Sequence, residues 1–176
     1  MTRDPEIQAL LDKQAITEVV ARYARTLDWI DDEGQASCYW PDAAIDYGFF
    51  KGRADEFLPV VMQTERNSDR RWHMLGGLII KLNSETSASS ECYGIFAGAS
   101  VQEDETLAGN MFGGRYLDEW EKRESDGGME WRVSARTYIL DWQHRLTDQP
   151  GFTPNPDFPL PTLQIADSGH PFYRPM

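Results

Sequence analysis

Residues 72–101, WHMLGGLIIKLNSETSASSECYGIFAGASV, carry the clearest secondary-structure pattern in this chain. They contain two apolar runs, Trp72–Leu82 and Ala88–Val101, separated by the polar segment Asn83–Thr86. Apolar runs of this kind, bounded by polar turn residues, are typical of strands. The stretch therefore predicts two long strands joined by a turn.

The same pattern continues toward the C-terminus. Leu107–Arg123 and Trp131–Trp142 predict two further strands, and Gln102–Glu105 and Ser125–Gly128 supply the breaks. Glycines within strands suit bulges and bends, which would curl the sheet around a cavity. The glycines in question are Gly76, Gly77, Gly94, Gly98, Gly113 and Gly114. We expect one strongly curved antiparallel sheet.

The N-terminal part of the chain has a helical pattern. Between Pro5 and Leu27 the apolar residues recur at steps of three and four, which predicts an amphipathic helix. Asp4 is suited to cap this helix and Pro5 to occupy its first position. The helix is expected to end between Asp28 and Asp32, where negative charge accumulates.

Shorter elements follow before the long strands begin. Gln35–Trp40 predicts a short helix that Pro41 would stop, and Asp42–Tyr47 predicts a short strand. Ala54–Gln63 predicts a third helix, in which Pro59 leaves the length open. Helices followed by long antiparallel strands indicate an α+β domain, with the helices packed on one curved sheet.

We expect this domain to cover residues 1–145 and a proline-rich C-terminal arm to cover residues 146–176. The arm contains seven prolines, namely Pro150, Pro154, Pro156, Pro159, Pro161, Pro171 and Pro175. Phe152, Phe158, Phe172 and Tyr173 would anchor it on the same domain or on a neighbouring subunit.

Charge and composition exclude several classes of protein. A formal net charge of −12 in 176 residues, with a pI near 4.6, would repel both nucleic acid and an anionic membrane surface. No apolar run approaches the ~20 residues of a membrane span, and no signal peptide is evident. We therefore expect a cytoplasmic protein that binds neither nucleic acid nor membrane.

Neither the cysteines nor the histidines are spaced as metal ligands. Cys38 and Cys92 lie far apart in the chain and are expected to be buried free thiols. His73, His144 and His170 each lack a second histidine at a helical spacing. The sequence therefore predicts neither a metal nor another cofactor.

Six segments together resemble one known family. In order they are YARTLD at 23–28, PDA at 41–43, IDYG at 45–48, WHMLGG at 72–77, GRYLDEW at 114–120 and WRV at 131–133. Their order and spacing resemble the SnoaL-like branch of the nuclear-transport-factor-2-like superfamily, from about Glu6 to Trp142. This resemblance implies a cone-shaped, cystatin-like roll that encloses a pocket.

Within that superfamily the chain looks most similar to scytalone dehydratases and hexachlorocyclohexane dehydrochlorinases. The resemblance implies a catalytic pair, Asp28 from the end of the first helix and His73 from a strand, and a substrate-polarising Tyr47. Leu27 replaces the tyrosine that precedes the aspartate in the dehydratases, and the strand after His73 offers no second histidine. These differences argue against scytalone itself as the substrate.

The pair also makes chemical sense without the resemblance. An imidazole can take and give a proton near neutral pH, and a carboxylate on its other nitrogen fixes the tautomer and stabilises the charged ring. Arg136 is a candidate to bind an oxyanion, enolate or carboxylate, and the alternative is a salt bridge to one of the many carboxylates of the chain. Further candidates to line the substrate site are Tyr23, Trp72, Tyr93 and Tyr116.

The leading hypothesis is a cofactor-independent lyase that eliminates water or halide from a small hydrophobic substrate, aromatic or cyclic in structure. An isomerase, or a lyase that releases formaldehyde from an aromatic diol, would use the same pocket. A non-catalytic binding or assembly module is the alternative from another class. The resemblance also implies association as a homodimer or homotrimer through the open face of the sheet.

Overall fold

The computed structural model describes residues 4–104, 106–149, 167 and 169–175. Its helices are α1 (Pro5–Asp28), α2 (Asp32–Ala36) and α3 (Ala54–Arg66). Its strands are β1 (Tyr39–Asp46), β2 (Lys51–Arg53), β3 (Arg70–Leu82), β4 (Ser87–Val101), β5 (Leu107–Ser125) and β6 (Gly128–Gln149). The predicted α+β class is confirmed. Strands β3, β4 and β5 begin and end within two residues of their predicted bounds, whereas β6 begins three residues earlier than predicted and continues seven residues past Trp142.

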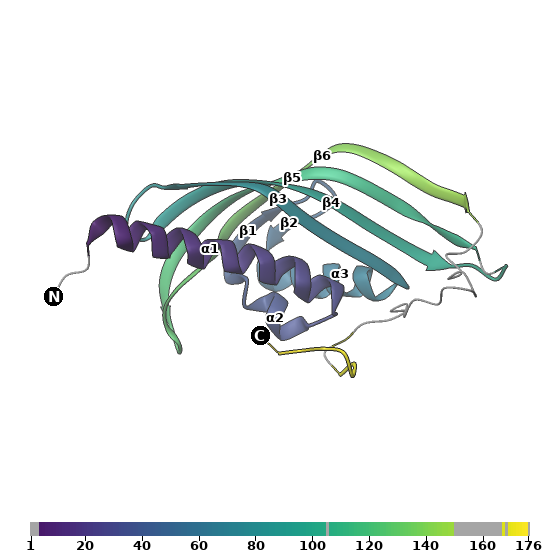
Figure 1. Ribbon diagram of the computed structural model, residues 1–176, viewed down its shortest axis with the longest axis horizontal. Coiled ribbons are helices and arrows are strands. Elements are labelled where there is room, and N and C mark those ends of the chain that lie inside the picture. The colour runs from purple at the N-terminus through teal and green to yellow at the C-terminus, as the bar shows by residue number, and fades with distance from the viewer. Residues whose placement is uncertain (1–3, 105, 150–166, 168, 176) are drawn as a thin grey trace.

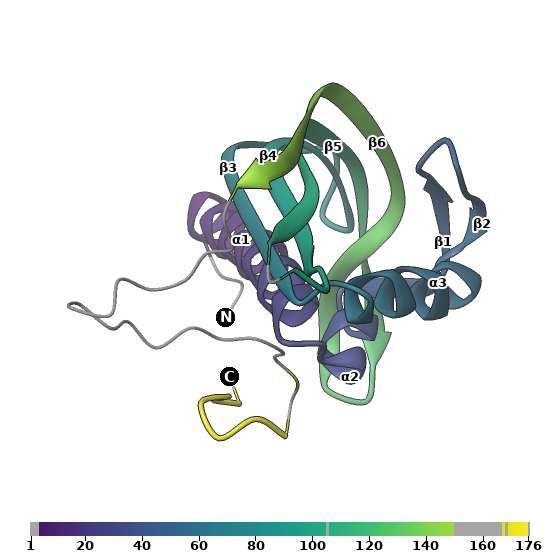
Figure 2. The ribbon, with the colours of Figure 1, turned by 90° about the vertical axis from the view of Figure 1, so that its right-hand side faces the viewer.

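The strands form one curved, unclosed sheet in the order β2-β1-β6-β5-β4-β3 (Figures 1 and 2). Neighbouring strands run antiparallel except for β1 and β6, which run parallel. The expectation of an entirely antiparallel sheet is wrong at this one pair. The sequence pattern specifies each strand separately, whereas the direction of a pair depends on the path of the chain between its members.

The helices lie on one side of the sheet, beneath the arch of the strands (Figure 1). Helix α1 packs mainly against β3, and α3 packs against β1. The buried face of α1 carries Ile16, Val19, Tyr23 and Leu27, which recur at the spacing of one helical face. Burying an aliphatic side chain of this size contributes about 1.5–3 kcal/mol, so this face fixes α1 across the sheet.

Glycines coincide with irregularities in the pairing of the strands. Gly77 has a φ of +61°, and the register of β3 against β4 shifts between Gly76 and Ile79. A second shift, between β5 and β6, falls at Gly113 and Gly114. The predicted bulges are confirmed at these two places, whereas Gly94 and Gly98 pair regularly.

Helix α1 ends at Asp28 through a local hydrogen-bond pattern. The backbone N–H of Asp31 donates to the carbonyl of Thr26 at 2.9 Å, and that of Ile30 donates to Leu27 at 3.2 Å. This pair of bonds requires a left-handed residue, and Ile30 takes that role with a φ of +52°. Asp28 is thereby placed in the last turn of α1, at the edge of β3.

The second helix differs from the prediction. It occupies Asp32–Ala36 rather than Gln35–Trp40, and the side chain of Asp31 caps it by accepting a hydrogen bond from the N–H of Gly34 at 2.9 Å. Pro41 does not follow a helix but lies within β1, where the pairing of β1 with β6 is irregular. A proline is accommodated there because the irregular segment does not need its missing N–H.

The third helix is longer than predicted. It continues through Pro59 and beyond Gln63 to Arg66. Phe57 and Met62, one on each side of the proline, are buried in the core. Their packing holds the helix together despite the hydrogen bond that the proline cannot donate.

The described end of the chain packs on the helices. The ring of Tyr173 lies 5.7 Å from that of Trp29, and its hydroxyl donates to Asp31 at 2.6 Å. The predicted anchors Phe152 and Phe158 lie outside the described residues. Among the described helices, none combines the length and apolarity needed to cross a bilayer.

Candidate active site

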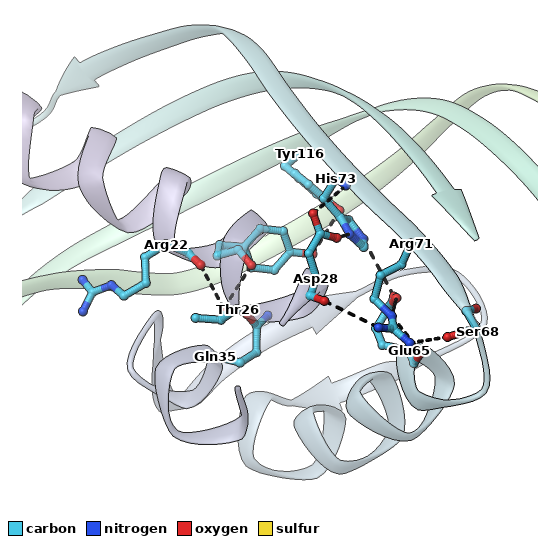
Figure 3. Close-up of polar contacts among 10 residues, drawn as sticks. Arg22, Thr26, Asp28, Gln35, Glu65, Ser68, Arg71, His73 and Tyr116 are labelled. Atoms are coloured by element: carbon cyan, nitrogen blue, oxygen red, sulfur yellow. Dashed lines mark hydrogen bonds and ion pairs between the residues drawn. The ribbon is translucent and has the colours of Figure 1, made fainter. Parts of the chain in front are cut away.

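Asp28 and His73 meet where the end of α1 lies against β3 (Figure 3). The Nδ1 atom of His73 lies 2.8 Å from Oδ1 of Asp28. The backbone N–H of His73 also donates to Oδ2 of the same carboxylate at 3.2 Å. We refer to these two residues as the reactive pair.

The geometry determines which nitrogen of His73 is available. A carboxylate accepts hydrogen bonds, so Nδ1 carries the hydrogen in this contact and Nε2 is the free base of the neutral ring. The His73 side chain is 9% exposed and that of Asp28 is 26% exposed. The pair is therefore largely withdrawn from water, which strengthens its electrostatic interaction.

A second carboxylate, which the sequence analysis missed, lies on the other side of the ring. Oε1 of Glu65, in the last turn of α3, is 3.8 Å from Nε2 of His73. The Glu65 side chain is 16% exposed, and burial raises the pKa of its carboxyl, although His73 and Arg71 oppose that rise. The signal that would have found it is the continuation of the third helix past Gln63.

Arg71 joins the elements that carry these groups. Its guanidinium donates to backbone carbonyls of Asp28 at 3.5 Å, of Glu65 at 3.1 Å and of Ser68 (Figure 3). Only 3% of this side chain is exposed, and burial lowers the pKa of the guanidinium. One buried cation therefore ties the ends of α1 and α3 to the strand that carries His73.

Three tyrosines that the sequence singled out form a hydroxyl cluster. The hydroxyl of Tyr23 lies 3.1 Å from that of Tyr47 and 3.0 Å from that of Tyr116. We call Tyr23, Tyr47 and Tyr116 the tyrosine cluster. Phe96 connects it to the reactive pair, because its ring lies 5.6 Å from that of His73 and 5.3 Å from that of Tyr116.

Burial keeps the phenols of Tyr23 and Tyr116 neutral. It raises the pKa of Tyr23 and of Tyr116 well above the ordinary value for a phenol. The neighbouring Tyr138 ring stacks on Tyr47 at 5.3 Å, and burial raises the pKa of Tyr138 to about 12. On the side of Phe96 the reactive pair therefore faces aromatic rings and the neutral hydroxyl groups of Tyr23 and Tyr116. Glu65 and Arg71 are its charged neighbours.

Arg136 is held in a buried ion pair. Its Nε and Nη2 donate to the carboxylate of Asp118 at 2.7 and 2.8 Å, and its Nη1 donates to the hydroxyl of Tyr39 at 2.9 Å. The guanidinium also lies over the rings of Tyr23 and Tyr116, 4.2 and 4.0 Å from their centres. Burial alone would lower the pKa of Arg136, but the Asp118 carboxylate more than offsets it and raises that pKa.

Trp72 and Tyr93 lie on the opposite face of the sheet from His73. Side chains alternate between faces along a strand, and Trp72, next to His73, is 61% exposed. Tyr93 is 49% exposed and lines a shallow groove of about 330 Å³ beside Trp142. We call this side of the sheet the outer face. The structure brings together Asp28, His73 and the tyrosine cluster, but not these two residues.

The described residues contain no group of three or more His, Cys, Asp and Glu side chains arranged to hold a metal ion. Cys38 and Cys92 are buried free thiols, as the sequence predicts. Burial raises the pKa of Cys38 to about 11, which leaves it protonated near neutral pH.

Solved structures share this fold at low sequence identity. A hexachlorocyclohexane dehydrochlorinase of type 2 superposes with a TM-score of 0.72 and 18% identity, covering 86% of this chain and 99% of that one. A putative scytalone dehydratase from Novosphingobium aromaticivorans gives a TM-score of 0.68 and 18% identity, with coverages of 83% and 95%.

A third similar structure is described by its fold. It is an NTF2-like protein with a cystatin-like fold from Novosphingobium aromaticivorans, with a TM-score of 0.59, 24% identity and coverages of 77% and 86%. A comparison with curated proteins finds no match. The family model described as the SnoaL-like domain matches residues 8–137, which include the end of α1, strand β3 and the tyrosine cluster. The chain therefore belongs to the SnoaL-like domain family.

Proposed function

We propose that the protein is a cofactor-independent lyase that eliminates water or halide from a small hydrophobic molecule, with His73 as the base. The observation that carries this proposal is the 2.8 Å contact between Nδ1 of His73 and Asp28. It leaves Nε2 as the basic atom of the neutral ring. The fold that the chain shares with a dehydrochlorinase and a putative dehydratase also supports it.

In this reaction Nε2 of His73 removes a proton from a carbon next to the one that bears the leaving group. The C–H bond breaks and the N–H bond forms, and the electron pair of the C–H bond becomes a carbon–carbon double bond as the leaving group departs. Asp28 stabilises the positive charge of the ring during this step. A departing hydroxide takes the proton from Nε2 and leaves as water, whereas a halide departs as the anion and the proton passes to solvent.

The surroundings of the pair favour a particular kind of substrate. A neutral imidazole is a weak base, so the C–H bond must be activated by an electron-withdrawing neighbour such as a carbonyl group, an aromatic ring or a carbon–halogen bond. The rings of Phe96, Tyr47 and Tyr138 pack against one another and make these surroundings aromatic, which suits a flat or cyclic molecule. Tyr47 is the hydroxyl that we propose polarises a carbonyl or the leaving oxygen, while Tyr23 and Tyr116 support its position.

We assign Arg136 a supporting rather than a reacting role. Its two-pronged bond to Asp118 and its bond to Tyr39 occupy donors on all three of its nitrogens. The guanidinium packs over the rings of Tyr23 and Tyr116 and so fixes them. Its role is therefore to hold the tyrosine cluster in place.

The test is turnover of a panel of small cyclic substrates. The panel contains β-hydroxy ketones fused to an aromatic ring and chlorinated cyclohexanes, and product formation is followed by liquid chromatography. We expect the wild-type protein to release water or chloride from at least one compound, and His73→Ala and Asp28→Asn to lose about 10²–10⁴-fold in rate. Equal turnover by the three proteins would contradict the proposal.

The same panel separates the alternative functions. A double-bond shift without loss of a group would indicate an isomerase, and release of formaldehyde from aromatic diols would indicate the other lyase. Tight binding of a compound by wild type, without any turnover across the panel, would favour a binding module.

A further inference from the structure

The imidazole of His73 lies between two carboxylates that come from different helices. Asp28, at the end of α1, lies 2.8 Å from Nδ1, and Glu65, near the end of α3, lies 3.8 Å from Nε2 (Figure 3). Nε2 is the atom that takes the proton in the proposed reaction. Glu65 is therefore the described carboxylate closest to the position where that proton arrives.

The Glu65 carboxylate is largely buried, so its negative charge needs a partner. Only 16% of its side chain is exposed, and a carboxylate in such a place costs free energy unless it is paired. Its described partners are Nε of Arg71, 4.0 Å from Oε2, and the His73 ring. Because the Arg71 contact is long, a positive charge on His73 provides much of the compensation that the Glu65 carboxylate needs.

Each element around the ring contributes its own groups to this balance. Helix α1 supplies Asp28, α3 supplies Glu65, and β3 supplies Arg71 and His73 itself. Strand β4 contributes only the uncharged ring of Phe96. Asp69 and Arg66 act from farther away, through their charges on Arg71. The two carboxylates that contact the ring are thus Asp28 and Glu65.

We propose that Glu65 is a positioning residue: once the ring is charged, its carboxylate closes from 3.8 Å to hydrogen-bonding distance of Nε2, accepts the hydrogen bond of the Nε2–H and so holds the transferred proton next to the substrate. This inference rests on the proposed function. When Nε2 takes the proton from carbon, Glu65 accepts a hydrogen bond from the new N–H group. The positively charged ring then lies between two negatively charged carboxylates. When the proton passes from Nε2 to the leaving oxygen or to solvent, the ring is neutral again and the cycle closes.

This arrangement leads to a test that needs no substrate. The chain has three histidines, so the ring signals of protein labelled with ¹⁵N-histidine are few, and His73→Gln assigns those of His73. In mildly acidic solution we expect the Nδ1 and Nε2 protons of His73 both to be protected from exchange with water. In Glu65→Gln the Nε2 proton should exchange about tenfold faster or more, because a charge-assisted bond is lost, while the Nδ1 proton stays protected.

Two further variants make this result specific. Glu33→Gln removes a negative charge from an exposed position on α2 and should leave both protons as in the wild type. Asp28→Asn should release the Nδ1 proton and leave the Nε2 proton protected. If Glu65→Gln does not fold, Glu65→Met fills the same volume without requiring a partner and is interpreted in the same way. Unchanged exchange at Nε2 in the folded variant would overturn the inference.

A kinetic measurement tests the role in the reaction. On a substrate found with the panel, Glu65→Gln should move the acid limb of the kcat/KM profile to lower pH by about one unit, because an opposite charge within ~4–6 Å is lost. Glu33→Gln should not move it. An acid limb that stays in place would contradict the positioning role. Failure of the whole panel, with the exchange pattern as expected, would count against the proposed function and not against the Glu65 contact.

Discussion

The Asp28 carboxylate receives two hydrogen bonds from one residue, His73. One oxygen lies 2.8 Å from ring Nδ1, and the other accepts the backbone N–H at 3.2 Å. The side chain therefore fixes the strand as well as the ring that projects from it. This double contact explains how a helix end and a strand, which are distant in sequence, can hold one imidazole in a defined orientation.

Removal of the Tyr47 hydroxyl should slow the reaction without unfolding the protein. Tyr47 bonds through Tyr23 to the rest of the tyrosine cluster, and in our proposal it polarises the substrate. We expect Tyr47→Phe to lower kcat by about 10²-fold, the usual cost of losing such a donor. Tyr138→Phe, which changes the ring stacked on Tyr47, is the control and should retain most of the activity. Equal rates for the two variants would argue against this role for Tyr47.

Loss of Arg136 should destabilise the fold strongly. The Asp118 and Arg136 side chains are 0% and 1% exposed, so Arg136→Met leaves a buried carboxylate without its cation. We expect the free energy of unfolding to fall by about 3–5 kcal/mol, measured with urea. Arg115→Met is the matched control, because Arg115 makes the same two-pronged pair with Asp141 between the same strands but on the exposed outer face.

Arg115→Met should lower the free energy of unfolding far less than Arg136→Met, because exposed ion pairs contribute little to stability. Similar losses for the two variants would contradict a structural role for Arg136. Loss of activity with unchanged stability in Arg136→Lys would instead support the catalytic role that the sequence suggested.

Asp12 should make the stability of the protein depend on pH. Its carboxylate accepts hydrogen bonds from Lys122 at 2.7 Å and from the Trp131 indole at 2.8 Å. Burial alone would raise the pKa of Asp12, but these bonds outweigh it and lower that pKa. A lowered pKa in the folded state means that the carboxylate stabilises the fold above the ordinary aspartate pKa of ~3.9. This contribution is lost as the pH falls through the lower folded value.

Urea unfolding of the wild type and of Asp12→Asn tests this expectation. We expect Asp12→Asn to cost about 1–3 kcal/mol at neutral pH and the difference to shrink at acid pH. Asp55→Asn serves as control, since Asp55 is paired with Arg53 on the surface. A difference for Asp12→Asn that is independent of pH would show that the charge of Asp12 is not what stabilises the fold.

Association as a homodimer or homotrimer stays a prediction. The outer face exposes large apolar side chains, including Trp72 at 61% and Met74 at 53%. Exposed apolar surface of this kind is what a second copy of the chain would cover. Analytical ultracentrifugation should show an oligomer for wild type and a smaller species for Trp72→Glu. A wild-type protein that sediments as a monomer at every concentration tested would refute the predicted association.

The sequence predicts the approach of Asp28 and His73 but not the whole site. Periodicity placed α1 and β3, and the resemblance placed one reacting group on each. Glu65 was missed because the predicted third helix stopped at Gln63, since Pro59 left its length open. The helix continues to Arg66 because Phe57 and Met62 pack in the core. Local patterns do not contain such tertiary effects.

The predictions for three other residues failed for different reasons. Trp72 was expected to line the site, although the two-residue alternation of a strand places it opposite His73, so the sequence already contained the information. Pro41 was interpreted as a helix stop, because the irregular pairing of β1 that accommodates it depends on β6. The partner of Arg136 was not foreseen, since Asp118 is one of many carboxylates and only the register of β5 with β6 places the two residues opposite each other.

Proton abstraction by His73 can be measured without knowing the leaving group. A bicyclic aryl ketone that lacks a leaving group is dissolved in D₂O, and the exchange of its acidic C–H for deuterium is followed by NMR. We expect rapid exchange with wild-type protein and a loss of about 10²–10⁴-fold in both His73→Gln and Asp28→Asn. Exchange in wild type that is no faster than in buffer, or that persists in both variants, would contradict proton abstraction by His73.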